Sequence, residues 1–94
     1  MAHQINISGD FSTEEALKWK KVLNVDALKK ESISIDMVNV RTADITGINA
    51  LATTQKILLG FGKTLSISVK KNSQLANLIN LTKLNSSISV ITIE

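Results

Sequence analysis

Strand-like and helix-like segments alternate along this chain of 94 residues, and this alternation restricts the possible folds more than any other feature. The segments predicted to be strands, most of them with the two-residue period of a half-buried strand, are 4–8, 32–38, 65–69 and 88–93. The segments in which apolar residues recur at helical spacing are 13–24, 48–59 and about 73–84. The predicted order β-α-β-α-β-α-β favours a mostly parallel sheet with right-handed crossovers.

Polar residues occupy alternate positions in two of the predicted strands, Ser34 and Asp36 in one and Ser66 and Ser68 in the next. Parallel strands that are covered on both faces are usually continuous runs of valine, isoleucine and leucine. We therefore expect helices mainly on one face of the sheet and a partly hydrated opposite face. The fold class that follows is α/β, a single domain over residues 1–94 with a mostly parallel or mixed four-stranded sheet.

Local signals predict where the elements begin and end. Ser12 to Glu15 reads as a capping box, in which the Ser12 hydroxyl would accept the amide hydrogen of Glu15. We expect residues 39–43 to form a loop, and Gly60 or Gly62 to end the second helix in a left-handed conformation. The residues expected to form the buried stripe of that helix are Ile48, Leu51, Ala52, Leu58 and Leu59.

The composition argues against most catalytic chemistry. The chain has no cysteine and a single histidine, His3, so thiolate chemistry, a catalytic triad and a cysteine- or histidine-based metal site are not expected. Neither a phosphate-binding loop nor a Gly-x-Ser-x-Gly nucleophile elbow is present. Asp36 and Asp44 are a conceivable magnesium pair, but the sequence suggests no third oxygen ligand. We therefore expect a non-enzymatic protein without cofactor or metal.

The charge pattern also limits the partners. The formal net charge is +3, three adjacent pairs of lysines lie near predicted element boundaries, and only three residues are aromatic. A nucleic-acid binder more often has a dense basic stripe with interleaved aromatic residues, so no nucleic-acid partner is expected. The longest apolar run is far shorter than the ~20 residues of a membrane span, and the N-terminus has no signal region. We expect a cytoplasmic protein without membrane insertion.

Asp44-Ile45-Thr46-Gly47 is the segment with the clearest functional signal, because it connects a predicted strand to the second helix. One interpretation is purely structural: Asp44 or Thr46 caps the helix and contributes about 1 kcal/mol. The other is that Thr46 exposes a hydroxyl where a phosphate would meet free amide hydrogens and the positive end of the helix dipole. A partner docked on that helix end would then have to bury close to two negative charges, and would be excluded.

The order and spacing of four blocks resemble the STAS domain, the family of bacterial anti-sigma factor antagonists and of sulfate-transporter tails. The blocks are Ile7–Ala16, Ser34–Val38, Thr42–Leu51 and Asn80–Asn85. The third block is similar to the Asp-Ser-Ser-Gly-Leu-x-x-Leu signature of the family, with Ile45 in place of the first serine and Thr46 in place of the second. Lys83 stands where the last block of the family usually has glycine.

The resemblance implies a function. Asp44 matches the signature aspartate, Thr46 the phosphoacceptor serine and Gly47 the signature glycine, and the partner-binding surface would include Asp44, Ile45, Thr46, Gly47 and Ile48. In the family, the unphosphorylated form binds an anti-sigma factor that is also a serine/threonine kinase of the histidine-kinase-like ATPase fold. Phosphorylation breaks that complex, and a metal-dependent, PP2C-type phosphatase restores it.

Two alternatives remain open at this point. STAS-like proteins also serve as non-catalytic accessory subunits of ABC lipid-transport complexes, where the same surface would hold a neighbouring subunit without phosphorylation. A third possibility is small-ligand sensing, such as nucleotide binding at the start of the second helix. Arg41, just before the motif, is either a solvated loop charge or a partner for a phosphate on Thr46.

Overall fold

The computed structural model describes residues 3–29 and 31–94. Its strands are β1 (His3–Asn6), β2 (Gly9–Phe11), β3 (Ile33–Met37), β4 (Val40–Ala43), β5 (Leu65–Lys70) and β6 (Ser89–Ile93). Its helices are α1 (Thr13–Ala27), α2 (Ile45–Gly60), α3 (Gln74–Thr82) and the short 3₁₀ helix η1 (Leu84–Ser86). The expected α/β class with a mostly parallel sheet is confirmed.

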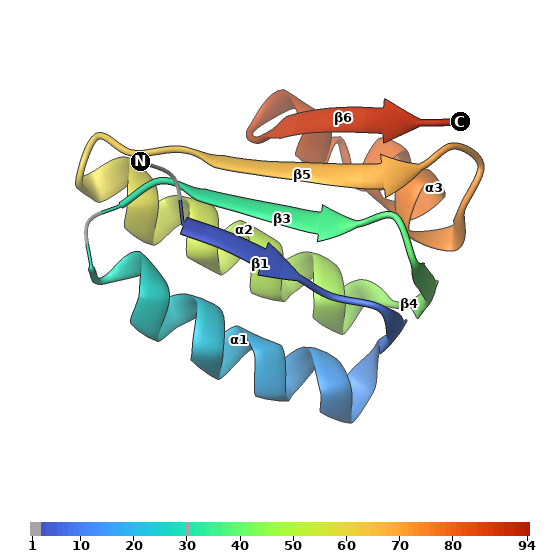
Figure 1. Ribbon diagram of the computed structural model, residues 1–94, viewed down its shortest axis with the longest axis horizontal. Coiled ribbons are helices and arrows are strands. Elements are labelled where there is room, and N and C mark those ends of the chain that lie inside the picture. Colours follow the sequence, from blue (N-terminus) through green and yellow to red (C-terminus); the bar gives the residue numbers. More distant parts are fainter. Residues whose placement is uncertain (1–2, 30) are drawn as a thin grey trace.

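The main sheet contains four strands in the order β1-β3-β5-β6, and every neighbouring pair is parallel. The strands thus lie side by side in the order in which they occur in the sequence, as Figure 1 shows. A right-handed crossover that always steps in the same direction across a sheet leaves every connecting helix on the same face. Figure 1 shows α1 and α2 lying along one side of the sheet.

The burial pattern agrees with this one-sided arrangement. Ile33, Ile35 and Met37 of β3 are at most 1% exposed, while Asp36 on the opposite face of the strand is exposed. In the sheet register Asp36 is paired with Ser68 of β5, so polar residues from neighbouring strands adjoin on this open face. The helices and the buried strand positions form one core cluster, to which α3 contributes Leu75, Ala76 and Ile79.

A second, smaller sheet was not expected. Residues 39–43, predicted to be a loop, contain β4, which pairs in parallel with β2 and has a register irregularity between Gly9 and Asp10. The loop prediction is therefore wrong for four of these five residues. The two short strands continue from the carboxyl ends of β1 and β3, and they lead directly into the first turns of α1 and α2.

The helix ends differ from the predictions in two respects. The Ser12 hydroxyl donates to Asp10 Oδ1 instead of accepting from Glu15, whose amide hydrogen bonds the Ser12 carbonyl oxygen, so the capping-box prediction is wrong. Leu59, expected in the buried stripe of α2, is 58% exposed. Gly62 does adopt the predicted left-handed conformation after α2, with φ +69°.

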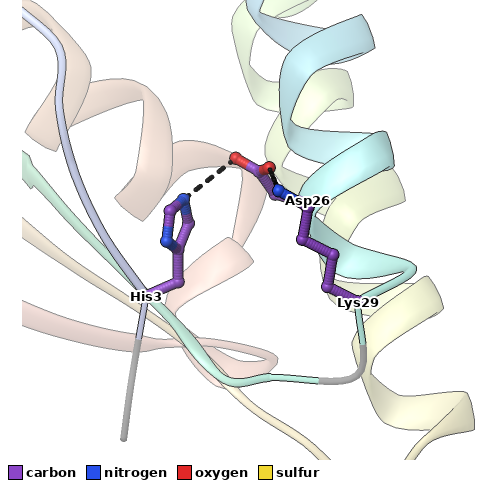
Figure 2. A network of polar contacts seen from close by, with 3 residues as sticks. All are labelled: His3, Asp26 and Lys29. Carbon is purple, nitrogen blue, oxygen red and sulfur yellow. Dashed lines mark hydrogen bonds and ion pairs between the residues drawn. The ribbon is translucent and has the colours of Figure 1, made fainter.

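A small polar network ties the edge strand β1 to the end of α1. Figure 2 shows the Asp26 carboxylate between His3 and Lys29, with distances of 3.2 Å to His3 Nε2 and 3.3 Å to Lys29 Nζ. The Asp26 side chain is only 12% exposed. The histidine of the chain thus has a structural contact in this corner of the domain.

Within residues 3–29 and 31–94, no three His, Cys, Asp or Glu side chains are grouped closely enough to hold a metal ion. No helix in the same part of the chain combines the length and hydropathy needed to cross a bilayer.

Candidate functional site

Asp44 caps α2 with its side chain. Its backbone is still extended, with φ −138° and ψ −173°, and the helix begins at the next residue. Asp44 Oδ1 accepts hydrogen bonds from the amides of Thr46 at 3.0 Å and Gly47 at 3.4 Å. These are two of the amide hydrogens that the first turn of a helix leaves without a partner inside the helix. The predicted N-cap role of Asp44 is therefore observed.

The other carboxylate oxygen of Asp44 binds the start of α1. Asp44 Oδ2 accepts from the Thr13 amide at 3.1 Å and from the Thr13 hydroxyl at 3.0 Å. Thr13 has a φ of +44°, a left-handed conformation that β-branched residues rarely adopt. One carboxylate thus joins the first turns of two helices, across 31 residues of sequence.

Asp44 and Asp10 both have a pKa below the usual value of an aspartate. Partial burial raises the pKa of Asp44, but hydrogen bonds from the Thr13 hydroxyl and from the amides of Gly47, Thr13 and Thr46 lower it by more. Hydrogen bonds from the hydroxyls of Ser12 and Thr42 lower the pKa of Asp10, against a smaller effect of burial. Both side chains are therefore in their ionised, hydrogen-bond-accepting form at neutral pH.

Thr46 lies in the first turn of α2 and is half-buried. Its amide hydrogen, and that of Gly47, are already bonded to Asp44. The expectation that a phosphate on Thr46 would find free amide hydrogens is therefore wrong for these two groups. A phosphate here would have to compete with the Asp44 carboxylate for them and would be repelled by its charge.

Gly47 and Ile48 are part of the packing of the domain. A Cβ atom on Gly47 would lie 2.7 Å from both the carbonyl oxygen and Cδ2 of Phe11, so glycine is required for the approach of α2 to β2. The Ile48 side chain is 4% exposed. By contrast, Ile45 is 56% exposed. Of the five predicted partner-binding residues, the surface is therefore formed by Asp44, Ile45 and Thr46.

An apolar groove of about 570 Å³ lies between the start of α2 and the outer side of α3. Its lining residues are Ala43, Asp44, Ile45, Gln74, Asn77, Leu78 and Leu81. Leu81 is 79% exposed, and Gln74 Oε1 accepts the Ala43 amide hydrogen at 3.3 Å and so ties the two walls together. α3 was not among the elements predicted to form the site. The available signal was Leu81, which falls outside the buried stripe of its helix.

Arg41 does not line this groove. It lines a different hollow, together with residues that follow β1 and β3 and with Lys70 at the end of β5. The structure therefore brings Asp44 and Ile45 together with α3, with Thr46 next to Ile45 in the chain, and it places Arg41 among another set of residues. The alternative that Arg41 pairs with a phosphate on Thr46 gains no support from this placement.

No protein-family model matches the chain, and no curated protein sequence matches it.

Proposed function

We propose that this protein is a non-catalytic regulatory domain of the STAS type that binds another protein through the start of α2 and the adjoining apolar groove. The partner class implied by the resemblance is an anti-sigma factor with serine/threonine kinase activity, with a PP2C-type phosphatase as the opposing enzyme. Thr46 is the phosphoacceptor of this proposal, and its phosphorylation would release the partner.

One observation carries the proposal: the hydroxyl-bearing first turn of α2 adjoins an exposed apolar surface. Ile45, beside Thr46, is 56% exposed and shares its groove with Leu81, which is 79% exposed. Exposed apolar side chains that gather in one groove are a common mark of a protein-binding surface. A regulatory residue is effective where a change in its charge falls at the edge of such a surface.

The energetics of a switch at this position are favourable. A phosphate carries close to two negative charges at neutral pH and would stand beside the ionised Asp44 carboxylate. A partner covering the groove would have to remove both groups from water. Weakening the complex 100-fold requires only about 2.7 kcal/mol, and burying an unpaired charge costs more than this.

The decisive experiment uses Thr46 and a second threonine of the same helix. With a kinase from the same cell and ATP, Thr46→Ala should abolish phosphate incorporation, while Thr53→Ala should retain it. Thr53 is the matched control, because its hydroxyl donates to the Asn49 carbonyl oxygen inside α2 and it lies about two turns further along the helix, away from the start of α2. In a binding assay, Thr46→Glu should lower the affinity for the partner about 100-fold, and Thr53→Glu should leave the affinity unchanged. Normal binding by Thr46→Glu would contradict the switch.

The exposed leucine also supports a second candidate, an accessory subunit of an ABC lipid-transport complex. Permanently occupied interfaces are more hydrophobic than transient ones, and Leu81 at the rim of an apolar groove fits such a contact. In that case Leu81→Asp should remove the protein from a permease–ATPase complex, while Thr46→Ala should leave the complex intact and unphosphorylated. Genes for a permease and an ATPase next to the gene for this chain would favour this second candidate.

A further inference from the structure

A hollow of about 630 Å³ lies at the carboxyl edge of the main sheet, away from the groove. It is lined by residues that follow β1 and β3, by the first residues of β4 and by the end of β5. The lining residues are Ser8, Gly9, Val38, Asn39, Val40, Arg41 and Lys70. None of them lines the groove between α2 and α3. Figure 1 shows the carboxyl ends of β1, β3 and β5 at the same end of the molecule, next to β4.

Two cations line this hollow, and neither takes part in an ion pair between described residues. Arg41 and Lys70 are both exposed. The neighbouring Lys71, in contrast, pairs with Glu94 at 3.2 Å. Two unpaired positive charges around one concave surface raise the local potential and attract an anion.

The nearby acidic side chains, Asp36 and Asp10, accept hydrogen bonds from neutral groups and form no ion pair with Arg41 or Lys70. Asp36 Oδ1 accepts the Val38 amide hydrogen at 3.1 Å within its own turn. Asp10 Oδ1 accepts the hydroxyl hydrogens of Ser12 and Thr42. Neither carboxylate lies within ion-pair distance of Arg41 or Lys70, since no such pair occurs between the residues that the structure describes. The side-chain donors of Arg41 and Lys70 therefore make no hydrogen bond or ion pair with a described acidic group, and they can both bind a ligand beside the two carboxylates.

The geometry points to a binding site for a small phosphomonoester in this hollow. The planar guanidinium of Arg41 offers paired N–H donors that match a phosphate, and the ammonium of Lys70 adds a third charged donor. The Ser8 hydroxyl and the Asn39 amide are neutral groups suited to a polar body such as a polyol. No aromatic side chain lines the hollow, so nothing there would stack a nucleobase. The volume is within the range of about 300–1,000 Å³ typical of small-molecule sites.

The test is a titration of ¹⁵N-labelled protein followed through its amide resonances. The probes are inorganic phosphate and glycerol 3-phosphate, with chloride at matched ionic strength. Both phosphates should produce saturable shifts at Gly9, Asn39 and Arg41, and chloride should not. Arg41→Gln and Lys70→Gln should each weaken binding at least 5-fold.

Lys71→Gln is the matched control, because it removes the neighbouring lysine, which lies outside the hollow. It should bind both phosphates as the wild type does. Unchanged resonances of core residues such as Ile35 and Leu51 in all variants would show that the fold is retained. Equal weakening by Lys71→Gln and Lys70→Gln, or equal shifts in chloride, would overturn the site. Tighter binding of adenosine monophosphate or of a phosphothreonine peptide than of glycerol 3-phosphate would overturn the assignment to small polar phosphomonoesters.

Discussion

The two carboxylate oxygens of Asp44 accept hydrogen bonds from the first turns of two different helices. Oδ1 faces the first turn of α2, and Oδ2 faces Thr13 at the start of α1. Thr13 retains a left-handed backbone that would ordinarily be strained, and both of its donors are bonded to the same carboxylate oxygen. The capping residue of α2 therefore also holds the start of α1, so a change at Asp44 affects both helices.

The lowered pKa of Asp44 has a consequence for stability at acid pH. Because the folded state binds this proton more weakly than the unfolded chain does, the ionised carboxylate stabilises the fold above the unfolded pKa of about 3.9. That contribution is lost as the pH falls through the lower pKa of the folded state. Asp44→Asn should therefore be less stable at pH 7 and should lose less stability than the wild type on acidification from pH 5 to pH 2.

Urea unfolding followed by the fluorescence of Trp19, which is partly buried against the core, would measure this pH dependence. Glu14→Gln is a suitable control, because Glu14 is exposed in the first turn of α1 and makes no hydrogen bond or ion pair with a described residue. On acidification Glu14→Gln should lose more stability than Asp44→Asn does, because it keeps the Asp44 carboxylate and its hydrogen bonds to both helices. An Asp44→Asn profile as steep as the wild-type profile would show that Asp44 contributes nothing to acid unfolding.

Two glycines of α2 should respond to alanine in opposite directions. Gly47→Ala places a methyl group 2.7 Å from the Phe11 carbonyl oxygen, a backbone atom that cannot move aside cheaply, and should cost about 1–3 kcal/mol. Gly60→Ala meets no atom within 4 Å and should stabilise the helix by about 0.5 kcal/mol. Thermal or urea unfolding of the two variants measures both effects. A stable Gly47→Ala would mean that β2 can move away from α2.

Gln55 links α2 to two other parts of the domain, the start of β5 and the segment after η1. It is 5% exposed on α2, its Oε1 accepts the Leu65 amide hydrogen at 3.1 Å, and its Nε2 donates to the Ser87 carbonyl oxygen at 2.6 Å. Gln55→Met keeps the length of the side chain but leaves both backbone groups without this partner, and should cost about 2 kcal/mol. The exposed neighbour Lys56 provides the control, since Lys56→Met should change the free energy of unfolding by less than about 0.5 kcal/mol. A loss below that level in Gln55→Met would show that water replaces both hydrogen bonds.

The elements that could be predicted from the sequence are those with a regular period. The strand at Ile33–Met37 alternates between buried and more exposed residues along its whole length. Its buried face and its approximate length could therefore be predicted from the sequence. β4 has buried residues only at its two ends, Val40 and Ala43, and its partner strand β2 has three residues and a register irregularity. A strand this short, without alternation, cannot be distinguished from a loop by periodicity.

The candidate site was only partly predictable for a different reason. The capping role of Asp44 depends on residues that follow it immediately, and local sequence shows such contacts. The need for glycine at position 47 comes from Phe11, and the bond between Asp44 and Thr13 also spans more than 30 residues. Ser12 failed as a cap because Asp10, two residues earlier, accepts its hydroxyl hydrogen. Which of several nearby groups a side chain bonds depends on contacts that form only in the folded chain.

One edge of the main sheet is formed by β6, whose Ile91 is 53% exposed and whose Ile93 is 42% exposed. An uncharged edge strand with exposed apolar side chains can pair with the same strand of another molecule. Ile91→Lys should therefore slow aggregation of concentrated, warmed protein, measured by light scattering, with little loss of thermal stability. Thr92→Lys, on the opposite face of the same strand, tests whether charge at the edge or loss of the apolar side chain is responsible. Unchanged aggregation in both variants would exclude β6 as the contact.

The arrangement of the four main strands also bears on how the polypeptide reaches its folded state. During synthesis from the N-terminus, β3 emerges when β1 is already available, β5 emerges when β3 is, and β6 comes last. No later segment has to be inserted between two strands of the main sheet that have already joined. Each connection closed on the way contains one α-helix and one further short element, β2, β4 or η1. The domain can therefore assemble by additions at a single growing side, in step with the ribosome.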